Sequence, residues 1–247
     1  MLLDLFAAIR QGDAEALKWA LASTLLALPI ILLALCVHET AHGYAANKLG
    51  DPTAQNLGRL TLNPIKHLDP IGFLCMLCFG FGWAKPVPVN SRYFKKPRRD
   101  MAITAVAGPA SNLLLALIFT ALLKLFCIIL GANSALLSST FVKNVFTFAY
   151  LLLSAGIQLN IGLAIFNLIP IPPLDGSKVL YMFLPPNLYF KMLRYERYVY
   201  FALLALLALG VITPILSFVS GYICDFFYLI FGITETDLIR ILFLLYY

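Results

Sequence analysis

Four stretches of the chain contain no Asp, Glu, Lys, Arg or His and are long enough to cross a lipid bilayer: 19–37, 101–123, 144–174 and 198–224. A bilayer core about 30 Å thick needs roughly 20 helical residues. Of the 247 residues, 61% are hydrophobic and 12% are charged, with a mean hydropathy of +0.88. This composition excludes a soluble globular domain. The sequence predicts an all-α polytopic membrane protein with about four transmembrane helices.

Shorter apolar segments predict elements that do not cross the bilayer. The stretch 71–84 has fourteen residues, a length typical of a short re-entrant segment or β-hairpin. Residues 1–18 alternate apolar and charged positions, which favours a helix lying in the membrane interface. Residues 222–247 carry four charged side chains, so we expect interfacial packing there rather than a fifth span.

The distribution of positive charge predicts the topology. Of 18 Lys and Arg residues, nine lie between 48 and 99 and four between 178 and 197, and two predicted spans separate these segments. The positive-inside rule assigns both segments to the cytoplasm. Anionic lipid head groups account for the net charge of +6. We therefore expect membrane lipids as partners and no nucleic acid.

The segment His38-Glu39-Thr40-Ala41-His42 follows directly after the first apolar run. Residues i and i+4 share one face of a helix, so the two imidazoles can converge on one ion, with Glu39 beside them as a general base. The alternative is a histidine pair on a helix surface with an incidental glutamate. Only three histidines occur in the chain, and ionisable groups beside hydrocarbon are usually functional, which favours a zinc site.

A hydrolytic zinc ion takes a third protein ligand. The extended pattern with a third histidine fails, because Ala45 and Lys48 occupy its Gly and last His positions. The remaining candidates are His67, Asp51, Asp69, Asp100 and Asp175. Only Asp175 closes a predicted span, after three prolines that interrupt the helix and free the chain to direct a carboxylate inward. The alternative is that Asp175 and Gly176 form a turn and helix start at the membrane surface.

With HETAH at 38–42 and NLIPIPPLDG at 167–176, the sequence resembles the site-2 protease family of intramembrane zinc metalloproteases. It also resembles the compact prokaryotic branch of that family, through DPTAQNLGRLTLNPIKHLDPIG at 51–72, FGWAKPVPVN at 81–90 and GPASN at 108–112. Ser177 departs from the pattern, because many relatives have a second Gly after LDG.

The resemblance implies one zinc ion per chain, with His38, His42 and Asp175 as ligands and Glu39 as the general base. It implies hydrolysis of peptide bonds within or near transmembrane segments of substrate proteins, in a prokaryotic plasma membrane, with the active site nearer the cytoplasmic side. We expect an interfacial segment at 1–18, a metalloprotease core at 19–185 and C-terminal helices at 186–247 that pack on the core.

Two segments are candidates for contact with the substrate. Residues 80–90 mix β-branched residues with Gly and Pro, which suits an irregular hairpin or edge strand near the metal. By resemblance, this segment, which includes Trp83 and Pro86, offers an edge to an extended substrate. Asn167 could orient the substrate or stabilise an oxyanion, or it could bond to a neighbouring helix; the resemblance favours the active site.

Several other polar residues have structural interpretations. We expect Asn112 to bond across a close helix contact at GPASN, His67 to belong to a loop network, and Cys75 and Cys78 to pack in apolar surroundings. A zinc or proton transporter would also place His, Glu and Asp at membrane depth, but no internal repeat is visible. A catalytically silent scaffold would lack a ligand or the base, and all four residues are present.

Overall fold

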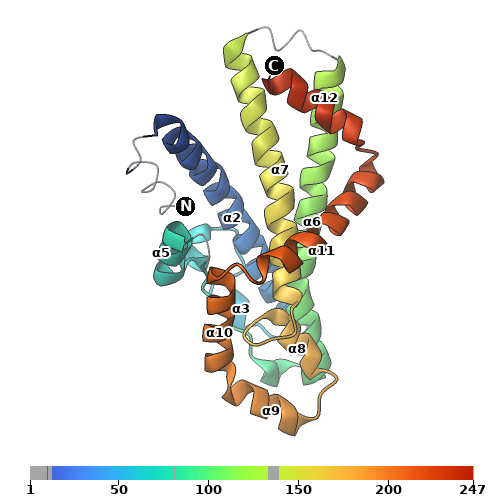
Figure 1. Ribbon diagram of the computed structural model, residues 1–247. Coiled ribbons are helices and arrows are strands. Elements are labelled where there is room, and N and C mark those ends of the chain that lie inside the picture. Colours follow the sequence, from blue (N-terminus) through green and yellow to red (C-terminus); the bar gives the residue numbers. More distant parts are fainter. Residues whose placement is uncertain (1–9, 11–12, 80–81, 133–138, 247) are drawn as a thin grey trace. The chain divides into compact units, whose positions relative to one another are not determined.

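The computed structural model describes residues 10, 13–79, 82–132 and 139–246, and these residues are mainly helical. The helices, shown in Figure 1, are α2 (Ala14–Lys48), α3 (Thr53–Asn56), α4 (Pro64–His67), α5 (Pro70–Phe79), α6 (Pro97–Ala132), α7 (Thr140–Leu168), α8 (Asp175–Tyr181), α9 (Pro186–Arg194), α10 (Glu196–Ala208), α11 (Thr213–Phe231) and α12 (Glu235–Tyr246). A short 3-10 helix covers Ser91–Tyr93. The described residues contain no strand, and a single antiparallel bridge joins Leu68 and Ala84. The predicted all-α class is confirmed.

In the described part of the chain, four helical segments are long and apolar enough to cross a membrane: Ala27–Lys48 of α2, and α6, α7 and α11. The number of spans agrees with the prediction, but their ends differ. Helix α2 continues past the apolar run to Lys48, so the HETAH segment lies inside the helix and not at its end. Helix α7 ends at Leu168, ahead of Pro170, because proline lacks the amide hydrogen that a helix needs.

The fourth predicted span, 198–224, is wrong as a single helix. Helix α10 ends at Ala208, Gly210 adopts a left-handed backbone angle (φ +71°), and α11 starts at Thr213 with Pro214 in its first turn. Glycine tolerates that angle, and proline favours the first turn of a helix, so this sequence separates two helices. The candidate span is α11, which reaches Phe231 and contains Asp225.

The short segments also differ in detail from the prediction. Residues 70–79 form the ten-residue helix α5, too short to cross a bilayer, and the Asp69 carboxylate accepts the Gly72 amide at its start (2.8 Å). Residues 82–90 have no regular secondary structure apart from the bridge at Ala84. Residues 14–18 belong to α2, whereas residues 1–9 of the predicted interfacial segment lie outside the described part of the chain.

The chain divides into two compact units. One comprises the described residues of Met1–Ser111 and Asn167–Tyr200, and the other those of Asn112–Phe166 and Phe201–Tyr247. In the second unit, apolar side chains of α6, α7, α11 and α12 form the core. Its fully buried members include Leu123, Leu130, Ile157 and Ile161. A Cβ at Gly156 would lie 2.7 Å from the Phe119 ring, so this glycine permits the close approach of α7 to α6.

Candidate metal centre

Helix α2 places two buried imidazoles side by side in the first unit. His38 and His42 lie one helical turn apart and are 5% and 7% exposed. Their Nε2 atoms are 3.0 Å apart, and the ring planes are nearly perpendicular at 87°. The i, i+4 spacing therefore produces the convergence that the sequence predicted.

Asp175, the first residue of α8, brings a carboxylate to the two imidazoles. Its Oδ2 atom lies 3.1 Å from Nε2 of His38 and 3.0 Å from Nε2 of His42. The preceding chain folds back beneath the end of α7, where a Cβ at residue 176 would lie 2.2 Å from the Leu168 carbonyl oxygen. Gly176 is thus required by the close approach of two backbone segments that directs Asp175 inward.

The three side chains fit a zinc ion. Two imidazole nitrogens and a carboxylate oxygen are the donor set of many catalytic zinc sites. A tetrahedral ion about 2.0 Å from each donor separates the donors by roughly 3.3 Å, and the donors here are 3.0 to 3.1 Å apart. Among the described residues, this is the group of His, Cys, Asp and Glu side chains close enough to share an ion.

Helix α6 supports the cluster from a second side. The Thr104 carbonyl oxygen lies 2.7 Å from Nδ1 of His42. Because a carbonyl only accepts, Nδ1 carries a hydrogen, and Nε2 faces the cluster: it donates to Asp175 when the ring is protonated and presents its lone pair to a metal when the ring is neutral. One turn further along α6, a Cβ at Gly108 would lie 2.4 Å from Nε2 of His42 and 2.6 Å from Nε2 of His38. Gly108 therefore leaves open the space in front of both nitrogens.

The charge of Asp175 is stabilised from two directions. Its second oxygen, Oδ1, accepts a hydrogen bond from Nζ of Lys178 at 2.9 Å. Burial raises the pKa of the Asp175 carboxyl, but the hydrogen bonds of His38 and His42 and the positive charge of Lys178 outweigh burial. The pKa is held well below its ordinary value, so Asp175 is an anionic donor.

Glu39 lies beside the cluster and contacts the segment 82–90. Its Oε2 atom accepts the amide hydrogen of Val87 at 2.7 Å. The same segment is held from the other side by buried Arg59, whose terminal nitrogen donates to the carbonyl oxygens of Lys85 (2.8 Å) and Pro86 (3.3 Å). The backbone of this segment is therefore fixed next to the candidate general base.

Asp51 fixes the far end of that segment. It is fully buried, and its Oδ2 accepts the Asn90 amide at 2.7 Å, while Oδ1 accepts from the amide and hydroxyl of Thr53. Sequence reasoning considered Asp51 only as a possible ligand and assigned no role to Arg59. The Asp-Pro-Thr turn was a local signal for a structural carboxylate, but the partners of both residues are distant in sequence.

The predicted substrate-contacting residues lie in the same unit. The Trp83 side chain is 36% exposed and packs edge-to-face on Tyr200 at 6.3 Å between ring centroids. Pro86 is exposed, with its carbonyl held by Arg59. Asn167 is half-buried in the last turn of α7. Their contact with a substrate stays a prediction.

His67 and the two neighbouring cysteines lie outside the cluster. Nε2 of His67 donates to the Thr61 carbonyl oxygen at 2.7 Å, and the Thr40 hydroxyl donates to the same oxygen at 2.7 Å. His67 thus belongs to a loop network that fastens residues 59–68 to α2. Cys75 and Cys78 are half-buried free thiols on α5.

The match to a family model now defines the class of protein. Residues 26–210 match the model of peptidase family M50. This range contains the cluster, Glu39 and three of the four candidate spans. The chain therefore belongs to this family, the site-2 proteases, and is an integral membrane zinc metalloprotease.

Individual relatives agree with the family assignment. YwhC of Bacillus subtilis, named as a candidate zinc metalloprotease, is 44% identical over 189 residues, which cover 76% of this chain and 81% of YwhC. Rip2 of Mycolicibacterium smegmatis carries the same description and is 29% identical over 70% of this chain and 66% of its own length. MJ0611 of Methanocaldococcus jannaschii is 33% identical over 44% of this chain and 49% of its own length. No solved structure matches the chain.

Proposed function

We propose that the chain is an intramembrane zinc metalloprotease that hydrolyses peptide bonds within or near transmembrane segments of substrate proteins. His38, His42 and Asp175 hold one zinc ion per chain, and Glu39 is the general base. The observation that carries the proposal is the buried group of two imidazoles and one carboxylate, because both histidines and Glu39 lie inside a candidate span. A hydrolytic donor set thus includes two ligands from a segment that is long and apolar enough to cross a membrane.

The chemistry divides between the ion and the chain. Bound zinc supplies a Lewis acid that acidifies water and polarises the scissile carbonyl. Glu39 accepts the proton of the attacking water and returns it to the leaving amine. The hydrogen bond from Val87 to Oε2 holds one oxygen of the carboxylate, and we assign proton transfer to the other, Oε1. The Thr104 carbonyl fixes the His42 ring while this occurs.

The substrate is a transmembrane protein whose helix unwinds before cleavage, because the carbonyls of an intact helix are occupied by hydrogen bonds. Segment 82–90 lies outside regular secondary structure and is fixed beside Glu39, which supports its role as a docking edge for unwound backbone. Trp83, Pro86 and Asn167 are the side chains that we assign to substrate contact. We assign the site to the cytoplasmic side of a prokaryotic plasma membrane, and the density of Lys and Arg in 48–99 and 178–197 supports this assignment.

The test compares Glu39→Gln with Glu235→Gln in purified, zinc-loaded protein. Glu235 is an exposed glutamate on α12, so its substitution makes the same chemical change away from the cluster. We expect Glu39→Gln to retain zinc and to cleave single-span reporter peptides at least about 100-fold more slowly than the unsubstituted protein. Glu235→Gln should cleave them at the normal rate. Equal cleavage by the two variants contradicts the role of Glu39.

A further inference from the structure

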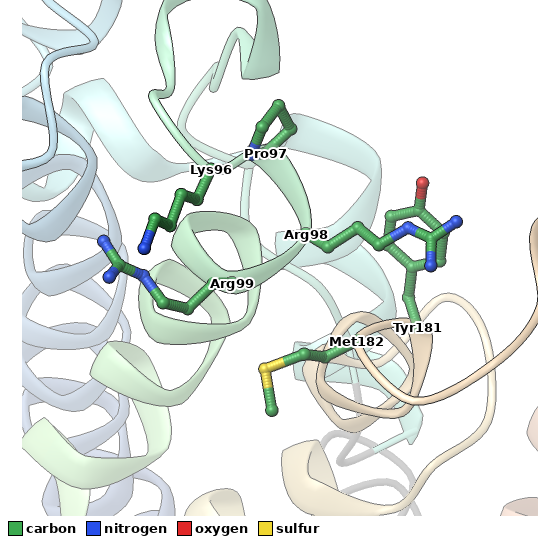
Figure 2. Close-up of a pocket in the computed structure, with 6 residues that line it drawn as sticks. All are labelled: Lys96, Pro97, Arg98, Arg99, Tyr181 and Met182. Atoms are coloured by element: carbon green, nitrogen blue, oxygen red, sulfur yellow. The ribbon is translucent and has the colours of Figure 1, made fainter.

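The first unit has a recess at the start of α6 that the metal centre does not use. It has a volume of about 520 Å³ and is lined by Lys96, Pro97, Arg98, Arg99, Tyr181 and Met182. Figure 2 shows Arg98 against the Tyr181 ring on one side and the side chains of Lys96 and Arg99 on the other. The volume is in the range of small-molecule sites. The lining combines three cations with apolar and aromatic surface.

The positive charges of the recess are only partly neutralised. Arg99 pairs with Asp100, Nε and a terminal nitrogen lying 2.8 and 2.7 Å from Oδ1. Oδ2 of Asp100 accepts a hydrogen bond from the amide of Lys96, directly ahead of α6, at 2.9 Å. The Asp100 carboxylate thus caps the start of this helix. Within the described part of the chain, no carboxylate lies within ion-pair distance of the side chains of Lys96 or Arg98, although the charge of Lys96 also acts on Asp100. Arg98 is therefore the cation of the recess that remains most available to an anionic ligand.

Tyr181 orients the Arg98 guanidinium. The guanidinium carbon lies 5.4 Å from the centre of the Tyr181 ring, within the range of a cation–π contact. Such a contact occupies the flat face of the guanidinium, while its N–H donors point outward in the plane of the group. This arrangement suits two oxygens of one phosphate, because arginine binds phosphate with two parallel hydrogen bonds.

The surroundings of the recess match the boundary between lipid head groups and acyl chains. Pro97 begins α6, a candidate membrane span. Ile103 and Val106, one and two turns beyond Arg99 on the same side of the helix, are 46% and 40% exposed. Phe183, directly after Met182, is 72% exposed. An acyl chain can contact these apolar side chains while its head group lies among the cations.

We propose that this recess binds the phosphate head group of an anionic phospholipid, with Arg98 as the phosphate ligand, Tyr181 as the residue that positions Arg98, and Lys96 as a second cation on the opposite side of the recess. A lipid is favoured over a soluble phosphate because exposed apolar side chains continue from the recess along α6. The proposal does not depend on the proteolytic function.

The test measures lipid retained by the purified full-length protein after extraction from nanodiscs that contain equal amounts of phosphatidylglycerol and phosphatidylcholine, using native mass spectrometry. The variants are Lys96→Gln/Arg98→Gln, Tyr181→Leu and Tyr181→Phe. Lys95→Gln is the matched control, because Lys95 is an exposed neighbouring cation that does not line the recess. All four substituted positions are exposed or half-buried, and unchanged melting and zinc content verify folding.

We expect the double variant to bind phosphatidylglycerol about tenfold more weakly, the affinity change that accompanies loss of a charge-assisted contact. Tyr181→Leu should fall in between, and Tyr181→Phe and Lys95→Gln should match the unsubstituted chain. Equal loss in Lys95→Gln and the double variant overturns the proposal, because the effect is then general surface charge. The proposal is also overturned if the unsubstituted protein retains phosphatidylcholine as well as it retains phosphatidylglycerol. Complete displacement by millimolar inorganic phosphate or glycerol phosphate assigns the recess to a soluble ligand instead.

Discussion

Gly108→Ala is predicted to abolish high-affinity zinc binding without changing any ligand. The added methyl carbon would lie 2.4 Å from Nε2 of His42 and 2.6 Å from Nε2 of His38. A nonbonded carbon normally stays about 3.5 Å from such an atom, so rings or helices must shift by roughly 1 Å. Zinc sites tolerate about 0.2 Å in ligand distance. Substitutions outside the first coordination sphere that misorient a ligand lower metal affinity by 10- to 100-fold. For Gly108→Ala, which displaces two ligands, we expect zinc affinity to fall by at least about 100-fold.

Gly162→Ala is the matched control for this substitution. Gly162 also lies inside a helix, α7, and a Cβ there meets nothing within 4 Å. Both variants gain about 0.5–1 kcal/mol of helix propensity, so a difference between them reports the metal centre alone. The assay is competition for zinc against a calibrated chelator, with circular dichroism to verify helicity. If Gly108→Ala retains zinc with the affinity of Gly162→Ala, the placement of α6 against the histidines is wrong.

Two further substitutions test other parts of the account. Arg59→Met should lower the free energy of unfolding in a denaturing detergent by about 1.5–3 kcal/mol, because it leaves the carbonyls of Lys85 and Pro86 without their charged donor. Arg92→Met, at an exposed position, is the control. An equal effect of the two substitutions would contradict this role of Arg59. Backbone and side-chain hydrogen bonds from Thr234, together with Lys124, lower the pKa of Asp237 below its ordinary 3.8. Its contribution to stability is thus present above pH 3.8 and is lost as the pH falls below that value. Asp237→Asn should therefore lower the melting temperature more at pH 7 than near pH 3, and equal lowering at both pH values would refute the link to its charge.

The parts of the site that sequence predicted are those encoded by local geometry. His38 and His42 converge because helical spacing alone places them on one face. Asp175 follows a proline run that ends a long apolar helix, because three prolines between 170 and 173 remove the amide hydrogens that a continuing helix needs. Both features need only the preferences of neighbouring residues.

The parts that sequence did not predict come from the approach of distant segments. Gly108 was interpreted as a small residue for helix packing, whereas in the structure it faces both zinc-binding candidates. The Thr104 carbonyl that orients His42 is a backbone group, which carries no sequence signal. The amide of Val87 on Glu39 depends on how Arg59 and Asp51 fix a loop.

The boundaries of the spans show the same limitation. A charge-free run is a measure of composition, and it extended across Gly210 and Pro214 although both residues indicate a helix boundary. The run also ends at Cys224, because Asp225 is charged, whereas α11 continues past Asp225 to Phe231. Charge alone thus predicted how many spans there are better than where they end.

X-ray absorption at the zinc edge of the purified protein reports directly which atoms bind the ion. If His38, His42 and Asp175 hold the ion, we expect one zinc per chain, with two imidazole nitrogens and carboxylate oxygen at about 2.0–2.2 Å and no sulfur. Asp175→Ala should keep the two-imidazole signal and lose the carboxylate contribution, with weaker binding. A sulfur ligand at about 2.3 Å, or a spectrum with fewer than two imidazoles, would contradict a centre built from His38, His42 and Asp175.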